Sequence, residues 1–147
     1  MAKFDQRSNL QFARALEASI SNATPVNGNL IDLKGFEAAT FFVFTGTITA
    51  ATGGINFKLQ HSDTTEGGDF ADVAAADYIG DPADLEITEN DNDQVVGTIG
   101  YRGNKRYLRM VVTGHASNDA ALVRAVCAKG RPHLAETAPT QANIAAT

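Results

Sequence analysis

Titratable and nucleophilic side chains occur along the chain, but their spacing matches no catalytic motif. The three histidines, His61, His115 and His133, are far apart, and none belongs to an HExxH zinc motif. There is no GxSxG nucleophile sequence and no GxxxxGK[ST] phosphate-binding loop. Cys127 is the single cysteine, which excludes an intramolecular disulfide, and its apolar neighbours indicate a small buried hydrophobe. We therefore expect a protein that is not an enzyme and needs no cofactor.

Two acidic clusters contain the carboxylates that Ca²⁺ prefers as ligands. They are formed by Asp63, Glu66 and Asp69, and by Glu89, Asp91 and Asp93. The second cluster lacks the mid-loop glycine and the downstream glutamate of an EF-hand, so we expect solvated loops and predict no metal site. Carboxylates for glycosidase chemistry are abundant, but the chain has no Trp, which counts against a sugar-processing cleft.

Basic and aromatic residues gather in one short stretch of the chain. The stretch contains Tyr101, Arg102, Lys105, Arg106, Tyr107 and Arg109. Such a combination can stack single-stranded nucleic acid, but the positive charge is confined to one predicted hairpin. Two interpretations stay open: a surface that meets an acidic partner protein, and a purely structural hairpin tip.

The length and charge of the chain limit its class. It has 147 residues, enough for one domain with its own core, and a net charge of −5. An acidic chain lacks the excess of Lys and Arg that neutralises phosphates, so it is not a general nucleic-acid binder. No apolar run approaches the ~20 residues that span a membrane, and MAKFDQRSNL lacks the apolar region of a signal peptide. We expect synthesis in a cytoplasm and neither nucleic acid nor membrane as a partner.

The clearest strand patterns lie in the first half of the chain. Residues 38–48 are apolar on both faces, which suits a central strand that is packed on two sides. Residues 55–62 alternate between apolar and polar side chains, as a half-buried strand does. The glycine pair at 53–54 supplies the backbone freedom that a reversal between them needs. A weaker strand is predicted at 70–74.

Further strands are predicted along the rest of the chain, separated by turn residues. They lie near 16–23, 30–33, 85–87, 94–101, 106–113 and 120–128. Residues 102–105 form a predicted hairpin turn. This pattern predicts an all-β fold, an antiparallel β-sandwich or jelly roll with an N-terminal arm and a flexible C-terminal tail. The expected limits are 1–23 for the arm and its lead-in to the first strand, 24–131 for the body and 132–147 for the tail.

The core is expected to contain one apolar face of each main strand. The predicted core residues are Phe42, Phe44, Ile55, Phe57, Leu59, Leu108, Met110, Val112, Leu122 and Val126.

Five segments carry a resemblance to a known family. They are IDLKGFEAATFFV (31–43), GTIT (46–49), FKLQHSD (57–63), FADVAAADYIG (70–80) and GYRGNKRYLRMVVT (100–113). In order and spacing they resemble small virion proteins of tailed bacteriophages that act as capsid decoration or cement proteins. The chain departs from that pattern in a longer tail after Pro132 and in the more acidic stretch DLEITENDND.

The resemblance implies a β-sandwich or jelly-roll body and no catalysis. It implies a structural protein that is made in the host cytoplasm and binds the outer surface of the virion capsid, with the major capsid protein as its partner. Two alternatives stay open. One is a tail or head–tail joining protein, and the other is a host-binding or glycan-binding β module.

A protein that bridges a lattice is expected to form a closed homo-oligomer, with a trimer favoured. The N-terminal arm has too many apolar residues for a free tail, so we expect it to pack on another subunit or on the capsid protein. The basic stretch would add electrostatic steering. The candidate interface residues are Phe4, Leu10, Phe12, Leu16, Ile20, Arg102, Lys105 and Arg106.

Overall fold

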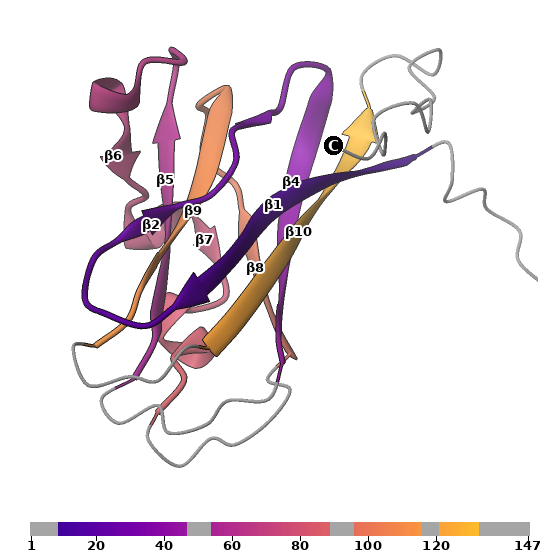
Figure 1. The fold of residues 1–147 in the computed structure, drawn as a ribbon. Helices are drawn as coiled ribbons and strands as arrows, with labels where there is room; N and C mark the ends of the chain where they lie inside the picture. Colours follow the sequence, from indigo (N-terminus) through magenta and orange to yellow (C-terminus); the bar gives the residue numbers. More distant parts are fainter. Residues whose placement is uncertain (1–8, 47–53, 89–95, 116–120, 133–147) are drawn as a thin grey trace, which may run out of the picture.

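The computed structural model describes residues 9–46, 54–88, 96–115 and 121–132 (Figure 1). In this part of the chain the strands form two antiparallel sheets that face each other. The all-β sandwich predicted from the sequence is therefore confirmed. No helix among these residues is long and apolar enough to cross a membrane.

Sheet A contains the longer strands. Its order is β1 (Leu10–Ile20), β10 (Ala121–Pro132), β4 (Phe36–Thr45), β8 (Val96–Tyr101) and β7 (Tyr78–Ile79). Figure 1 shows β1 lying along β10, and these two strands pair from Leu10 opposite Gly130 to Ile20 opposite Ala121.

Sheet B is smaller and covers the inner face of sheet A. Its order is β2 (Val26–Asn27), β9 (Tyr107–Thr113), β5 (Asn56–Ser62) and β6 (Ala71–Asp72), and β3 (Ile31–Asp32) also pairs with β9. Three short 3₁₀ helices, η1 (Gly67–Asp69), η2 (Ala75–Asp77) and η3 (Pro82–Leu85), lie in the described connections of this region.

The core fills the space between the sheets. Its largest fully buried side chains are Phe41, Ile20, Ile31, Ile55, Leu59, Ile87, Ile99, Leu108, Met110, Val43, Val112 and Val123. Successive side chains of a strand point to opposite faces, so every second residue of each long strand contributes to this layer. Leu85 of η3 also enters the core, where it occupies the space beside Gly97 of β8.

The core prediction is correct in sheet B and wrong in sheet A. The predicted core residues of β5 and β9, together with Ile55, are buried. In β4, however, Phe41 and Val43 are buried, whereas Phe42 is only partly buried and Phe44 is 39% exposed. Strand β10 shows the same inversion: its predicted core residues Leu122 and Val126 are only partly buried and lie on the outer face. Both faces of β4 and β10 are largely apolar, so alternation alone did not reveal which face points inward.

The predicted arm is also corrected. The first strand begins at Leu10 rather than near residue 16, and it belongs to sheet A along its whole length. Leu16 and Ile20 are 2% and 1% exposed, so they belong to the core of their own chain and are not available to a partner. A β-bulge between Arg14 and Leu16 shifts the register. This irregularity hides the alternation in the sequence.

Two connections differ from the predicted ones. Residues 102–105 do not form a hairpin turn, because β8 belongs to sheet A and the following β9 to sheet B. They form an arch between the sheets, here called the end arch (102–106). The predicted strand at 85–87 is the end of η3 followed by a single β-bridge from Ile87 to Ile55.

Backbone hydrogen bonds close the sandwich where β1 approaches sheet B. Gly28 N donates to Met110 O of sheet B at 2.7 Å, and Asn29 N donates to Ala15 O of sheet A at 2.7 Å. A Cβ atom added to Gly28 would lie 2.3 Å from Ala15 O and 2.9 Å from Met110 O. A glycine is therefore required where the chain passes between β1 of sheet A and β9 of sheet B. The same contact partly covers the free edge of β1.

Replacing Gly28 with alanine is expected to lower the free energy of unfolding by about 2–4 kcal/mol, because the added methyl group displaces backbone and breaks an inter-sheet hydrogen bond. Urea denaturation measures this change. Gly68→Ala is the matched control, since its Cβ would meet no atom within 4 Å. Equal stabilities of the two variants would contradict the close approach at Gly28.

Candidate interface site

The residues predicted for the interface do not lie together. Phe4 is outside the described residues. Leu16 and Ile20 are in the core, as shown above. Phe12 remains a candidate, because 59% of its surface is exposed on the outer face of sheet A, and Leu10 is partly exposed at the start of the same strand. The three basic residues lie at the end arch, in the connection from β8 to β9.

Arg106 of the end arch is bound to an acidic residue of its own chain. Its Nε donates to Asp32 Oδ1 at 2.9 Å and its Nη2 to Asp32 Oδ2 at 2.8 Å. These two bonds are the main reason that the pKa of Asp32 lies below its ordinary value. The guanidinium also lies over the ring of Tyr107, 4.7 Å from its centroid. The pair holds the arch against β3.

The other two basic residues of the arch also have partners within the chain. Lys105 forms an ion pair with Asp63, which lowers the pKa of that carboxyl. Arg102 Nε donates to the backbone oxygen of Ala76 at 2.7 Å. These contacts are those expected of a structural tip. The alternative, in which the arch meets an acidic partner, stays a prediction.

Tyr101 anchors the arch from inside the sandwich. Its hydroxyl accepts a hydrogen bond from Lys105 N at 3.0 Å and joins His61 Nδ1 of sheet B, also at 3.0 Å. Its ring fills the space beside Gly103, where an added Cβ would lie 2.3 Å from the hydroxyl oxygen. Burial raises the pKa of Tyr101 above its ordinary value, so the phenol is neutral at physiological pH. It is a structural residue.

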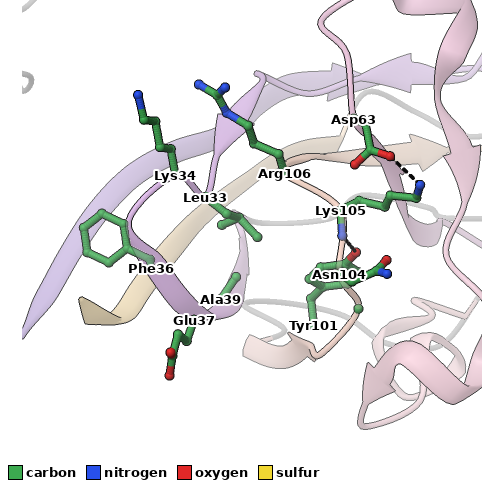
Figure 2. A pocket seen from close by; sticks show the side chains of 11 residues that line it. Leu33, Lys34, Phe36, Glu37, Ala39, Asp63, Tyr101, Asn104, Lys105 and Arg106 are labelled. Carbon is green, nitrogen blue, oxygen red and sulfur yellow. Dashed lines mark hydrogen bonds and ion pairs between the residues drawn. The ribbon is translucent and has the colours of Figure 1, made fainter. Parts of the chain in front are cut away.

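A hollow of about 400 Å³ lies between the end arch and the corner that precedes β4 (Figure 2). Charged residues line it, including Lys34, Glu37 and Asp63. Figure 2 shows Lys105 joined to Asp63 and to Tyr101 by dashed lines, so these groups already have partners. The hollow therefore offers no free nucleophile–base pair from its described lining.

Neither a metal cluster nor a reactive thiol is found in the described parts of the chain. No group of three His, Cys, Asp or Glu side chains is arranged there to hold a metal ion. Cys127 of β10 belongs to the core between the two sheets and has no exposed surface, and burial raises its pKa to about 12. A thiol in this state is not a nucleophile at neutral pH.

The outer face of sheet A carries three of the four exposed large apolar side chains that the described residues contain, Phe12, Phe44 and Ile79. Its large apolar side chains are Leu10, Phe12, Phe42, Phe44, Ile79, Leu122 and Val126. Phe12 and Ile79 are each 59% exposed and lie on opposite edge strands. Exposed apolar patches of this kind mark interaction sites in soluble proteins.

The strand register arranges this face in rows. One row crosses the sheet through Phe12, Ala128, Thr40, Gly100 and Ile79. The next row crosses it through Arg14, Val126, Phe42 and Thr98. The middle of the first row consists of small residues, whereas the middle of the second consists of large ones.

Charge on this face is limited to one corner. Arg14 lies 3.8 Å from Glu17, and Arg124 lies 3.5 Å from the same carboxylate. The three side chains form a small cluster of ion pairs at one side of the face. The rest of the face is apolar or carries a hydroxyl group, in contrast with an acidic chain of net charge −5.

Comparison with known proteins adds little to this geometry. No protein family matches the sequence, and no curated protein is significantly similar to it. Among solved structures, the chain is similar to one from a study entitled "Bacillus endospore appendages form a novel family of disulfide-linked pili". The alignment covers 84% of this chain and 89% of that chain, with a TM-score of 0.44 and 9% identity. We draw no conclusion about function from so distant a likeness.

Replacing Asp32 with asparagine is expected to reduce stability in a pH-dependent way. The pKa of Asp32 is lowered in the folded state, so the ion pair stabilises the protein above pH ~4 and this contribution is lost as pH falls through the folded pKa. The effect should be smaller than that of Gly28→Ala, because the side chains of Arg106 and Asp32 are 45% and 42% exposed.

Urea denaturation of wild type and Asp32→Asn across the acid range measures this difference. The two stabilities should differ near neutral pH, begin to converge as the pH falls below the ordinary pKa of an aspartate, and meet below the lowered pKa of the folded state. Asp84→Asn, on the exposed side of η3, is the control. A constant difference at all pH values would show that the ion pair is not its source.

Proposed function

We propose that the protein is a structural virion protein that binds the outer surface of a tailed-phage capsid and stabilises the lattice. The observation that carries the proposal is β4, a central strand with large apolar side chains on both faces. Phe41 is completely buried against sheet B, whereas Phe44 on the opposite face is 39% exposed. A second apolar face fits a protein that works in an assembly.

The choice of a capsid among assemblies rests on the five sequence segments described above. Four of these segments lie within the described residues, where they form β3, β4, β5, the stretch from β6 through η2 to β7, and the end arch with β9, whereas most of GTIT (46–49) lies outside the described residues. These elements therefore belong to the scaffold that holds sheet A in place. They also contain Asp32, Tyr101 and Arg106 with the contacts described above. The resemblance thus concerns the folded body, and the partner that it implies is the major capsid protein.

A non-catalytic role agrees with the chemistry of the described residues. The thiol of Cys127 is buried and protonated, and the hydroxyl groups of Tyr78 and Tyr101 are used to join the two sheets. The basic residues of the end arch neutralise Asp32 and Asp63. These groups serve the stability of the fold, and the apolar surface is left for binding.

Sedimentation with undecorated capsid shells tests the proposal. Purified protein is mixed with shells of the major capsid protein, the shells are pelleted, and bound copies are counted per shell. We expect saturable binding at many copies per shell, because a lattice repeats the same site. Tail tubes of the same phage serve as the control particle. Binding to tubes alone would favour the tail or head–tail alternative, and binding to glycans alone would favour the host-binding alternative.

The part played by the N-terminal segment is tested separately. Deletion of residues 2–8 leaves β1 intact, whereas a longer deletion that extends into β1 would damage sheet A. If the segment that contains Phe4 packs on the lattice, the truncated protein should fold normally and occupy shells less fully. Unchanged occupancy would leave the body as the attachment surface. Circular dichroism and the unfolding midpoint check that the body is intact.

A further inference from the structure

The outer face of sheet A is large enough to form a stable protein interface. Four of its strands, β1, β10, β4 and β8, lie side by side. At ~4.8 Å between strands and ~3.4 Å per residue, their lengths of 11, 12, 10 and 6 residues cover roughly 640 Å². A standard interface buries about 800 Å² on each partner. This face with its projecting side chains is therefore close to that size.

The charge on this face is confined to one corner, where it can stay at the polar rim of an interface rather than at its centre. Its charged side chains, Arg14, Glu17 and Arg124, already form ion pairs with one another at one corner. Burial of an unpaired charge would oppose association strongly. An apolar surface gains free energy from contact with another apolar surface. A second copy of this face therefore suits it better than the remaining described surface of this acidic chain.

The outer face of sheet A has a row of small residues beside a row of large ones, so its shape is complementary to that of a second copy. The row through Ala128, Thr40 and Gly100 forms a shallow trough of small residues, with Ile79 leaning over Gly100 at its end. The neighbouring row, only two residues further along each strand, forms a ridge of Val126 and Phe42. The trough and the ridge therefore run parallel across the same sheet.

We propose that the outer face of sheet A stacks on the same face of a second copy about a two-fold axis. The axis runs across the strands between the row of Thr40 and the row of Phe42. Rotation about it places the ridge of each copy over the trough of the other, with β4 over β4 and β10 over β10. Such a contact is isologous, and the strands stay aligned, as they do in stacked sheets.

Another orientation fits less well. A two-fold axis along the strands would place the ridge of one copy on the ridge of the other, so that Phe42 and Val126 would hold the sheets apart. A cyclic trimer, the oligomer favoured by the sequence, uses heterologous contacts and would not pair this face with itself. The inference goes beyond the proposed function, because it concerns the isolated protein and needs no capsid. In the dimer the second copy covers the outer face of sheet A, so attachment to a lattice would use other surfaces of the dimer.

Sedimentation velocity over a range of protein concentrations tests the inference. We expect the full chain to form a dimer, with twice the 15.5 kDa mass of one chain. The Phe42→Lys variant should associate about 100-fold more weakly, because two ammonium groups per dimer would face the apolar troughs. Leu30→Lys is the matched control, since Leu30 is 44% exposed but lies outside sheet A, and it should dimerise like wild type.

Cross-linking tests the orientation of the pair. Thr98 is exposed in the ridge row, and the proposed axis brings the two copies of β8 together. A Thr98→Cys variant should be linked by a bismaleimide that spans roughly the 10 Å between stacked sheets. Cys127 is fully buried and should not react. Failure to cross-link a dimer that does form would overturn the proposed axis.

Two results would overturn the inference itself. One is a monomer at every soluble concentration, and the other is an oligomer that Phe42→Lys leaves unchanged while the variant is folded by circular dichroism. These results are distinct from failure of the proposed function. Dimers that do not bind shells would contradict the capsid role alone, and monomers that bind shells would contradict the self-stacking alone.

Discussion

The fold depends on a strand that has two apolar faces. Strand β4 pairs with β10 on one side and with β8 on the other, so its position within sheet A is fixed by hydrogen bonds at both edges. One face of this strand must point to sheet B, and Phe41 provides it without any exposed surface. The other face then necessarily points outward, because successive side chains of a strand alternate. The apolar surface is thus a consequence of the same strand that builds the core.

The two sheets are held at a fixed distance by polar contacts as well as by packing. Tyr78 of sheet A bonds through its hydroxyl to the backbone of Leu59 in sheet B, and the hydroxyl of Tyr101 bonds to the side-chain Nδ1 of His61. Near β1, the backbone at Gly28 and Asn29 joins both sheets directly. Buried hydroxyl and amide groups stabilise a structure only when they are paired, so these contacts specify one spacing of the sheets. A fixed spacing keeps sheet A in shape as a binding surface.

The sequence predicted where strands lie better than which way they face. The alternation in β5 is strict, and its apolar residues Phe57 and Leu59 are in the core as expected. In β4 and β10 both faces are apolar, so the inward face depends on the opposing sheet and not on local pattern. The start of β1 was missed because a bulge interrupts its alternation. A four-residue connection such as 102–105 fits a hairpin or an arch equally well, and the arch is selected by distant contacts that put β8 in sheet A and β9 in sheet B, including that of Tyr101 with His61.

The candidate site differs from the sequence expectation in its apolar residues, and it gives the basic residues partners within the chain. The sequence left open whether the basic residues near 102–106 meet an acidic partner or form a structural tip, and in the structure each has an acceptor in its own chain, which fixes the end arch. Phe42 and Val126 were expected in the core, and they form the ridge on the outer face. Both outcomes have one physical cause. A charge at a connection between sheets is stabilised by nearby carboxylates and carbonyls, whereas no further sheet of the described residues packs on the apolar outer face of sheet A. An interface of this protein is therefore expected to depend on apolar burial and to tolerate salt.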